Sequence, residues 1–296
     1  MRAARKHGDV LRIPFISSFF NSAPVVPVLR LAGPIGAVTP LRQGLNLASM
    51  AGTIERAFAT KGAKAVAIQI NSPGGSAVQS MLIYQRIRDL ADEKDLPVYV
   101  FTEDVAASGG YLIALAGDEI YVNASSIIGS IGVVAATFGF DKAIKRLGVE
   151  RRVYTAGKNK VSLDPFQPEK ADDVDRLKRL QEDVHETFID LVKERRGRRL
   201  KDVEEDLFTG EFWSGKKALQ LGLVDGISDL RSKMREMLGK KVRLRLITPK
   251  RGLFGRRIRG VFTRYASEDS AFDSPGFADE LISAIEARAL WSRYGL

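Results

Sequence analysis

Short apolar runs and amphipathic segments alternate along most of this chain. The apolar runs are typical of buried strands, and they cover residues 25–33, 65–70, 97–103, 119–124 and 129–139. Helical spacing of apolar residues follows in segments at 45–62, 77–92, 109–117 and 141–148. A further apparent strand at 150–156 precedes a long charged helix over 168–196. Because buried strands that alternate with helices form parallel sheets, the pattern predicts an α/β fold with a largely parallel sheet.

The composition is typical of a globular protein, with 45% hydrophobic and 28% charged residues. A chain of 296 residues can bury a full α/β core. It has no run of 18 or more apolar residues, so we expect no transmembrane helix. The first 24 residues are basic and then briefly apolar, with two serines and a proline in the apolar part. We interpret residues 1–24 as an N-terminal arm.

Two glycine-rich turns carry the most informative chemistry. "NSPGG" (Asn71–Gly75) and "AASGGY" (Ala106–Tyr111) each follow a predicted buried strand and open a predicted helix. Glycines at such a turn let the backbone approach a ligand and direct free N–H groups at it. Ser108 stands beside these donors, where a nucleophile that attacks a carbonyl is expected. Together the turns indicate an acyl-transfer site, although either alone is typical of an ordinary α/β connection.

A serine nucleophile needs a base, and the residue counts narrow the choice. The two histidines are His7, in the basic N-terminus, and His185, in the charged helical run, where a solvated or half-buried structural role is expected. The chain has no cysteine, so thiol chemistry and cysteine-ligated metals are excluded. A lysine can act as a general base when burial lowers its pKa. Lys158 and Lys160, in "YTAGKNKVSLDPF", are the two candidates, and spacing alone does not choose between them.

Four segments, in this order, resemble the signal peptide peptidase A family of serine–lysine proteases. They are "NSPGG", the stretch from "AASGGY" to "IIGSIGV", "GKNKVSLDPF", and "FWSGKKALQLGLVDGI" (Phe212–Ile227). The resemblance covers residues 25–238 and implies a crotonase-like fold, with repeated ββα units, that the Clp protease shares distantly. It divides the chain into the N-terminal arm, residues 1–24, a peptidase domain, residues 25–238, and a remainder, residues 239–296. The remainder contains a basic stretch, a linker and a C-terminal helix.

The resemblance also assigns roles to individual residues. It implies that Ser108 is the nucleophile and Lys160 the general base, while Lys158 is a solvated neighbour. The N–H groups of Gly75 and Gly109 would form the oxyanion hole, and Ser130 would hydrogen-bond the lysine. No metal and no nucleotide or other cofactor is expected.

The resulting prediction is a serine endopeptidase that cleaves peptides, such as signal-peptide remnants, with a Ser–Lys dyad. One alternative is a crotonase-like acyl-CoA enzyme, which uses the same paired oxyanion donors but usually has carboxylates as acid–base groups. Another is a catalytically idle, membrane-associated scaffold. Ser108 and Lys160 at their motif positions argue against both.

The positive charge is concentrated in one segment, residues 240–264, which holds ten Lys and Arg and no Asp or Glu. The rest of the chain is balanced, so this segment accounts for the net charge of +10. It has three interpretations: an ordinary solvated edge, a patch for an anionic membrane surface, or a patch for an acidic partner. No nucleic-acid motif accompanies it, so we expect no nucleic acid partner. The family resemblance further implies a homo-oligomer larger than a dimer, and we expect the protein in the cytoplasm or peripherally at the inner membrane.

Overall fold

The computed structural model describes residues 23–36, 44–201, 207–249 and 288–296. Within these ranges the chain forms an eight-stranded sheet with the main order β6-β5-β3-β2-β1-β8. β4 pairs with β3 and β7, beside this path. All pairings are parallel except that of β5 with β6. The predicted α/β fold with a largely parallel sheet is confirmed.

The strands and helices predicted for residues 25–124 all form. The strands are β1 Val25–Ala32, β2 Val66–Ser72, β3 Val98–Ala107, β4 Glu119–Val122, β5 Ile127–Gly129, β6 Phe212–Ser214, β7 Gly226–Ile227 and β8 Arg243–Leu246. The helices are α1 Leu47–Phe58, α2 Ala77–Lys94, α3 Gly109–Ala114, α4 Asp141–Arg146, α5 Ala171–Arg196, α7 Gly215–Leu221 and α8 Leu230–Leu238, with a 3₁₀ turn at Gly197–Arg199. Polar caps fix the helix starts: Asn46 accepts the N–H of Ser49 before α1, and Ser76 that of Gln79 before α2.

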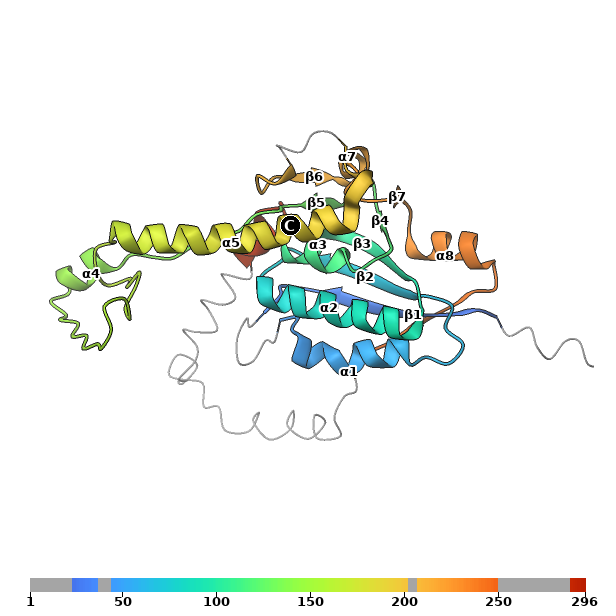
Figure 1. Ribbon diagram of the computed structural model, residues 1–296, viewed down its shortest axis with the longest axis horizontal. Helices are drawn as coiled ribbons and strands as arrows, with labels where there is room; N and C mark the ends of the chain where they lie inside the picture. Colours follow the sequence, from blue (N-terminus) through green and yellow to red (C-terminus); the bar gives the residue numbers. More distant parts are fainter. Residues whose placement is uncertain (1–22, 37–43, 202–206, 250–287) are drawn as a thin grey trace, which may run out of the picture.

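The sheet separates a large core from a small one. On the face covered by α1, α2 and α3 (Figure 1), apolar strand residues pack with these helices and with α5 and α7. On the opposite face, Met234 of α8 packs against a smaller cluster that includes Val26, Phe101 and Tyr121. The strands are therefore buried on both faces over much of their length, which accounts for their continuous apolar runs.

β3 changes neighbours along its length, and this delivers its last residues to the functional site. Its residues 99–102 pair with β4, whereas residues 105–107 pair with β5. A register irregularity in the pairing with β2 falls between Ile70 and Ser72, at the same level of the sheet. The strand end at Ala107 and the β2 end at Ser72 thus lie side by side.

Two predicted strands are wrong. Of the predicted strand 129–139 only Gly129 is in a strand, and residues 133–140 are exposed and irregular. Residues 150–156 are also exposed and form no strand. Most of both segments belongs to residues 133–170, here called the arm and distinct from the N-terminal arm. The start of the arm lines the cavity described below, and its α4 lies at the far end of α5 from the sheet (Figure 1). Their apolar residues have no sheet of this chain to pack on.

The arm is held together by its own contacts. The Phe166 ring lies 5.7 Å from the Phe140 ring and under the guanidinium of Arg151. Nη2 of Arg151 also lies 3.2 Å from a carboxylate oxygen of the buried Asp164. The arm is therefore a defined substructure with many outward-facing side chains.

The predicted domain boundaries stay a prediction, although β8 pairs with β1 in the same sheet beyond residue 238. The N-terminal arm and most of the basic stretch 240–264 lie outside the described residues. No helix in the described ranges is both long and apolar enough to cross a membrane.

Candidate active site

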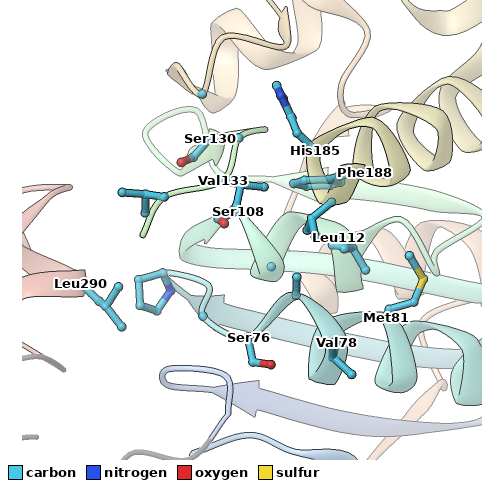
Figure 2. A pocket seen from close by; sticks show the side chains of 18 of the residues that line it. Ser76, Val78, Met81, Ser108, Leu112, Ser130, Val133, His185, Phe188 and Leu290 are labelled. Atoms are coloured by element: carbon cyan, nitrogen blue, oxygen red, sulfur yellow. The ribbon is translucent and has the colours of Figure 1, made fainter. Parts of the chain in front are cut away.

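Ser108 occupies the turn between β3 and α3 in a conformation unusual for serine. Its φ is 51° and its ψ is −124°. Its N–H donates to the carbonyl of Gly129 at 2.8 Å, and its carbonyl accepts from the N–H of Leu112 at 3.0 Å. Such a conformation in a non-glycine residue costs about 1–3 kcal/mol and persists where surrounding bonds enforce it. The half-buried Ser108 lines a cavity (Figure 2).

The two glycine-rich turns pack backbone to backbone, as their glycines require. A methyl group on Gly74 would lie 2.8 Å from Cβ of Ser108, and one on Gly110 would lie 2.6 Å from the carbonyl oxygen of Ser72. The hydroxyl of Ser72 accepts the N–H of Gly74 at 3.2 Å. The turn after β2 is therefore pressed directly against the turn that carries Ser108.

Two backbone amides beside Ser108 have no hydrogen-bond partner among the described residues and could bind a ligand. The bridge between Ile35 and the "NSPGG" turn uses the carbonyl of Gly74 and the N–H of Ser76, which turns the N–H of Gly75 away from Ile35. Gly109 is the first residue of α3, where an N–H has no partner within the helix. Both glycines line the cavity with Ser108. Paired amides of this kind can stabilise a developing oxyanion.

The cavity measures about 1230 Å³ and is mainly apolar in its lining. Its walls come from α2, α3, α5 and the start of the arm, with side chains that include Val78, Met81, Leu82, Leu112, Val133 and Phe188 (Figure 2). A cavity of this size can hold several residues of an extended peptide with apolar side chains.

Ser130 lies on the same cavity as Ser108 (Figure 2). Its φ is 53°, and its N–H donates to the carbonyl of Glu211 at 2.7 Å. This second strained serine follows β5 directly, so the strand end that binds the N–H of Ser108 also positions Ser130.

Tyr111 anchors α3 below the site. Its ring is fully buried and its hydroxyl donates to the carbonyl of Leu223 at 2.7 Å. Burial raises the pKa of Tyr111, so the side chain stays a neutral donor at any physiological pH.

The two predicted lysines lie away from this cavity. Lys158 and Lys160 are exposed residues of the arm, and neither lines the cavity. The arm leads into α5 at Ala171, whereas His185, 14 positions along that helix, lines the cavity. That spacing corresponds to about 21 Å along a helix axis. The structure therefore brings Ser108, Gly75, Gly109 and Ser130 together but leaves Lys160 apart.

His185 contacts the backbone beside the site. It is half-buried, and its Nε2 lies 3.0 Å from the carbonyl oxygen of Ile131. A carbonyl only accepts hydrogen bonds, so Nε2 carries a proton and donates it. The ring points away from Ser108 (Figure 2). His185 therefore ties α5 to the turn after Ser130. His7 lies outside the described residues.

Three cavity residues were not expected from the sequence. Leu290, Arg293 and Tyr294 near the C-terminus line the same cavity as Ser108. The sequence indicated only an amphipathic helix over 277–294, of which residues up to 287 lie outside the described ranges. Among the residues that are described, no three His, Asp or Glu side chains form a group that could hold a metal ion.

Comparison with known proteins assigns the family. The sequence profile of peptidase family S49 matches residues 91–243, about half of the chain. The chain belongs to peptidase family S49. It is also 34% identical over 171 residues to the chloroplastic serine protease SPPA of Arabidopsis thaliana, a match that covers 56% of this chain and 24% of that protein. The resemblance to signal peptide peptidase A proteins is thereby confirmed.

A second relative has a different name. The chain is 58% identical over 272 residues to a Brucella abortus protein named Na(+)/H(+) antiporter NhaA, a match that covers 92% of this chain and 37% of that protein. The chain thus spans little more than a third of this relative's length. Among solved structures it is similar to a membrane-bound stomatin-specific protease, with 16% identity, a TM-score of 0.46, and coverage of 77% of this chain and all of that one.

Proposed function

We propose that this protein is a serine endopeptidase in which Ser108 is the nucleophile. The observation that carries the proposal is the strained Ser108 between the amides of Gly75 and Gly109, which have no hydrogen-bond partner among the described residues, at the wall of an apolar cavity. The S49 family membership supports peptide hydrolysis as the chemistry.

The reaction follows from this arrangement. Ser108 Oγ attacks the carbonyl carbon of a peptide bond while its proton passes to a base. The carbonyl oxygen becomes an oxyanion, which accepts hydrogen bonds from the N–H groups of Gly75 and Gly109. The base then gives the proton to the leaving amine, and water hydrolyses the acyl-enzyme by the same route. The lining favours substrates with apolar or small side chains near the cleaved bond.

Lys160 of a neighbouring copy is the proposed base. Within one chain Lys160 precedes the start of α5 at Ala171 and does not line the cavity of Ser108, so a dyad of these two residues would need a second copy. The arm also exposes large apolar side chains: Val134, Phe138, Leu147 and Tyr154 are 64%, 72%, 78% and 89% exposed. Large apolar side chains this exposed favour burial in a protein interface. We propose that the arm docks on the next subunit of a homo-oligomer larger than a dimer and delivers Lys160 to that subunit's Ser108.

Ser130 is proposed to hold the incoming amine. Its hydroxyl lies on the cavity near Ser108, where it can accept a hydrogen bond from a lysine ammonium or donate one to the neutral amine. A lysine buried in this apolar cavity by the docking arm would have a lowered pKa, as a general base requires.

Labelling with a serine-directed peptidyl phosphonate tests the nucleophile. We expect modification of Ser108 in the wild type and none in Ser108→Ala. Lys160→Ala should slow labelling strongly, whereas the matched variant Lys158→Ala should label at the wild-type rate. An acyl-CoA enzyme or an idle scaffold would leave Ser108 unlabelled, and this result would refute the proposal.

A further inference from the structure

The C-terminal segment, residues 288–296, forms one side of the cavity that holds Ser108. Leu290 and Tyr294 are half-buried cavity residues four positions apart, so they share one face of the helix that covers 288–292 and its final turn. Leu290 lies on the opposite side of the cavity from Met81 and Leu112 (Figure 2). A peptide that lies along the cavity toward Ser108 therefore contacts this segment.

Side-chain packing attaches the segment to the rest of the molecule. The Tyr294 ring meets the Phe212 ring of β6 edge to face, with 5.2 Å between the ring centres. The hydrogen bonds of the described C-terminal residues are internal, such as that from the Tyr294 N–H to the Trp291 carbonyl. The position of the segment thus depends mainly on its apolar face, and on the Phe212–Tyr294 pair in particular.

The segment also introduces charge into the cavity. Of the described residues that line it, Arg293 is the one with a permanent charge, and none is acidic. No carboxylate of the described chain lies within ion-pair distance of Arg293. An unpaired guanidinium beside an apolar cleft is suited to bind a carboxylate of a ligand.

We propose that the C-terminal segment is a wall of the substrate cleft, in which Arg293 binds a carboxylate of the peptide and Leu290 and Tyr294 contact an apolar side chain. This inference rests on the proposed peptidase function. The preferred substrate class is then an apolar peptide with a free C-terminal carboxylate or an Asp or Glu side chain close to the cleaved bond. Because Arg293 is exposed, its contribution is moderate, about two- to fivefold in affinity at low salt.

Peptide binding to Ser108→Ala protein tests this without requiring catalysis. Three fluorescent peptides share one apolar sequence: one ends in an amide, one ends in a free acid, and one is an amide with an internal glutamate. Anisotropy titrations should give lower dissociation constants for at least one acidic peptide than for the neutral amide. Which acidic peptide binds more tightly identifies the source of the carboxylate.

In the Ser108→Ala background, Arg293→Gln should remove the difference in affinity between acidic and neutral peptides, and Arg293→Lys should keep part of it. Arg288→Gln is the matched control, because Arg288 is exposed on the same segment but does not line the cavity. Tyr294→Ala should weaken the binding of all three peptides and also remove the advantage of the acidic ones, because it frees the segment that carries Arg293. Tyr294→Phe, which keeps the ring contact with Phe212, should do neither. The proposal would be overturned if the protein that keeps Arg293 bound all three peptides equally. It would also be overturned if Arg288→Gln reduced the preference for acidic peptides as much as Arg293→Gln does. Tight binding by a protein whose wild type cleaves none of the peptides would instead count against the peptidase function.

Discussion

Replacing Gly75 by alanine adds one methyl group where the backbone leaves no room. The added carbon would overlap the carbonyl oxygen of Ile35 and lie 2.9 Å from both its carbonyl carbon and its nitrogen. These are backbone atoms of a bridge that fixes the turn, so no side-chain rotation can relieve the contact. The φ of 142° at Gly75 adds strain of about 1–3 kcal/mol for any other residue.

The catalytic effect follows from how far the turn must move. Relief of the overlap displaces the Gly75 N–H by more than the roughly 0.5 Å that a catalytic group tolerates. Loss of one oxyanion donor costs about 10²- to 10³-fold in kcat. We therefore expect Gly75→Ala to lower kcat on a fluorogenic apolar peptide by this factor with little change in KM, because the lost bond forms mainly in the transition state.

Gly33→Ala separates this effect from strain alone. Gly33 also has a positive φ, 111°, but a methyl group there meets nothing within 4 Å. Both variants should lose unfolding free energy in urea titrations, whereas Gly33→Ala should keep kcat near the wild-type value. If folded Gly75→Ala retained kcat within tenfold of the wild type, Gly75 would not be an oxyanion donor.

Three further substitutions test the roles of buried and capping groups. His185→Ala should lower kcat about tenfold, because it loosens the turn after Ser130. His185→Gln keeps a donor for the Ile131 carbonyl and should recover most of the activity. A loss that glutamine does not rescue would indicate that His185 acts as a base. Arg196→Leu should lower the free energy of unfolding, measured in urea, by about 3–5 kcal/mol, because it leaves Asp225 without its buried bidentate partner. A loss below about 1 kcal/mol would show that Arg199, which also pairs with Asp225, compensates. Asp229 caps α8, and hydrogen bonds from Ser232 lower the pKa of its carboxyl group. The ionised cap therefore stabilises the fold fully above the ordinary pKa of Asp. This stabilisation is lost as the pH falls through the lowered pKa. Asp229→Ala should therefore lose about 1 kcal/mol at neutral pH, and its difference from the wild type should shrink below about pH 4; a difference that does not change with pH would contradict this role.

The sequence predicted the central sheet because those strands are buried by their own chain. The apolar runs of β1, β2 and β3 pack between helices of the same molecule. Their continuous apolar sequence therefore correctly indicated strands buried on both faces. The arm has similar apolar residues, such as Val134 and Phe138, and they led to wrong strand predictions. A hydrophobic pattern reports that a residue needs burial, but it does not report whether the same chain or another copy provides it.

The candidate site was predictable where its residues are close in sequence to a turn with glycines. Ser108, Gly75 and Gly109 follow this rule, and the structure brings them together. The contributions of His185, Arg293 and Tyr294 to the cavity were not predictable, because each comes from a distant helix whose amphipathic pattern says only that one face is buried. The charged helical surroundings of His185 indicated a solvated or half-buried side chain, and the structure shows it half-buried.

Complementation between two inactive variants tests the shared dyad most directly. Ser108→Ala and Lys160→Ala proteins are dissociated, mixed in equal amounts and reassembled, and mixed oligomers are verified by differential tags. If each site combines Ser108 of one copy with Lys160 of another, about a quarter of the sites are intact by random assembly, and peptide hydrolysis should return to about that fraction of the wild-type rate. No recovery in verified mixed oligomers, while the wild type stays active, would contradict a dyad built across two copies.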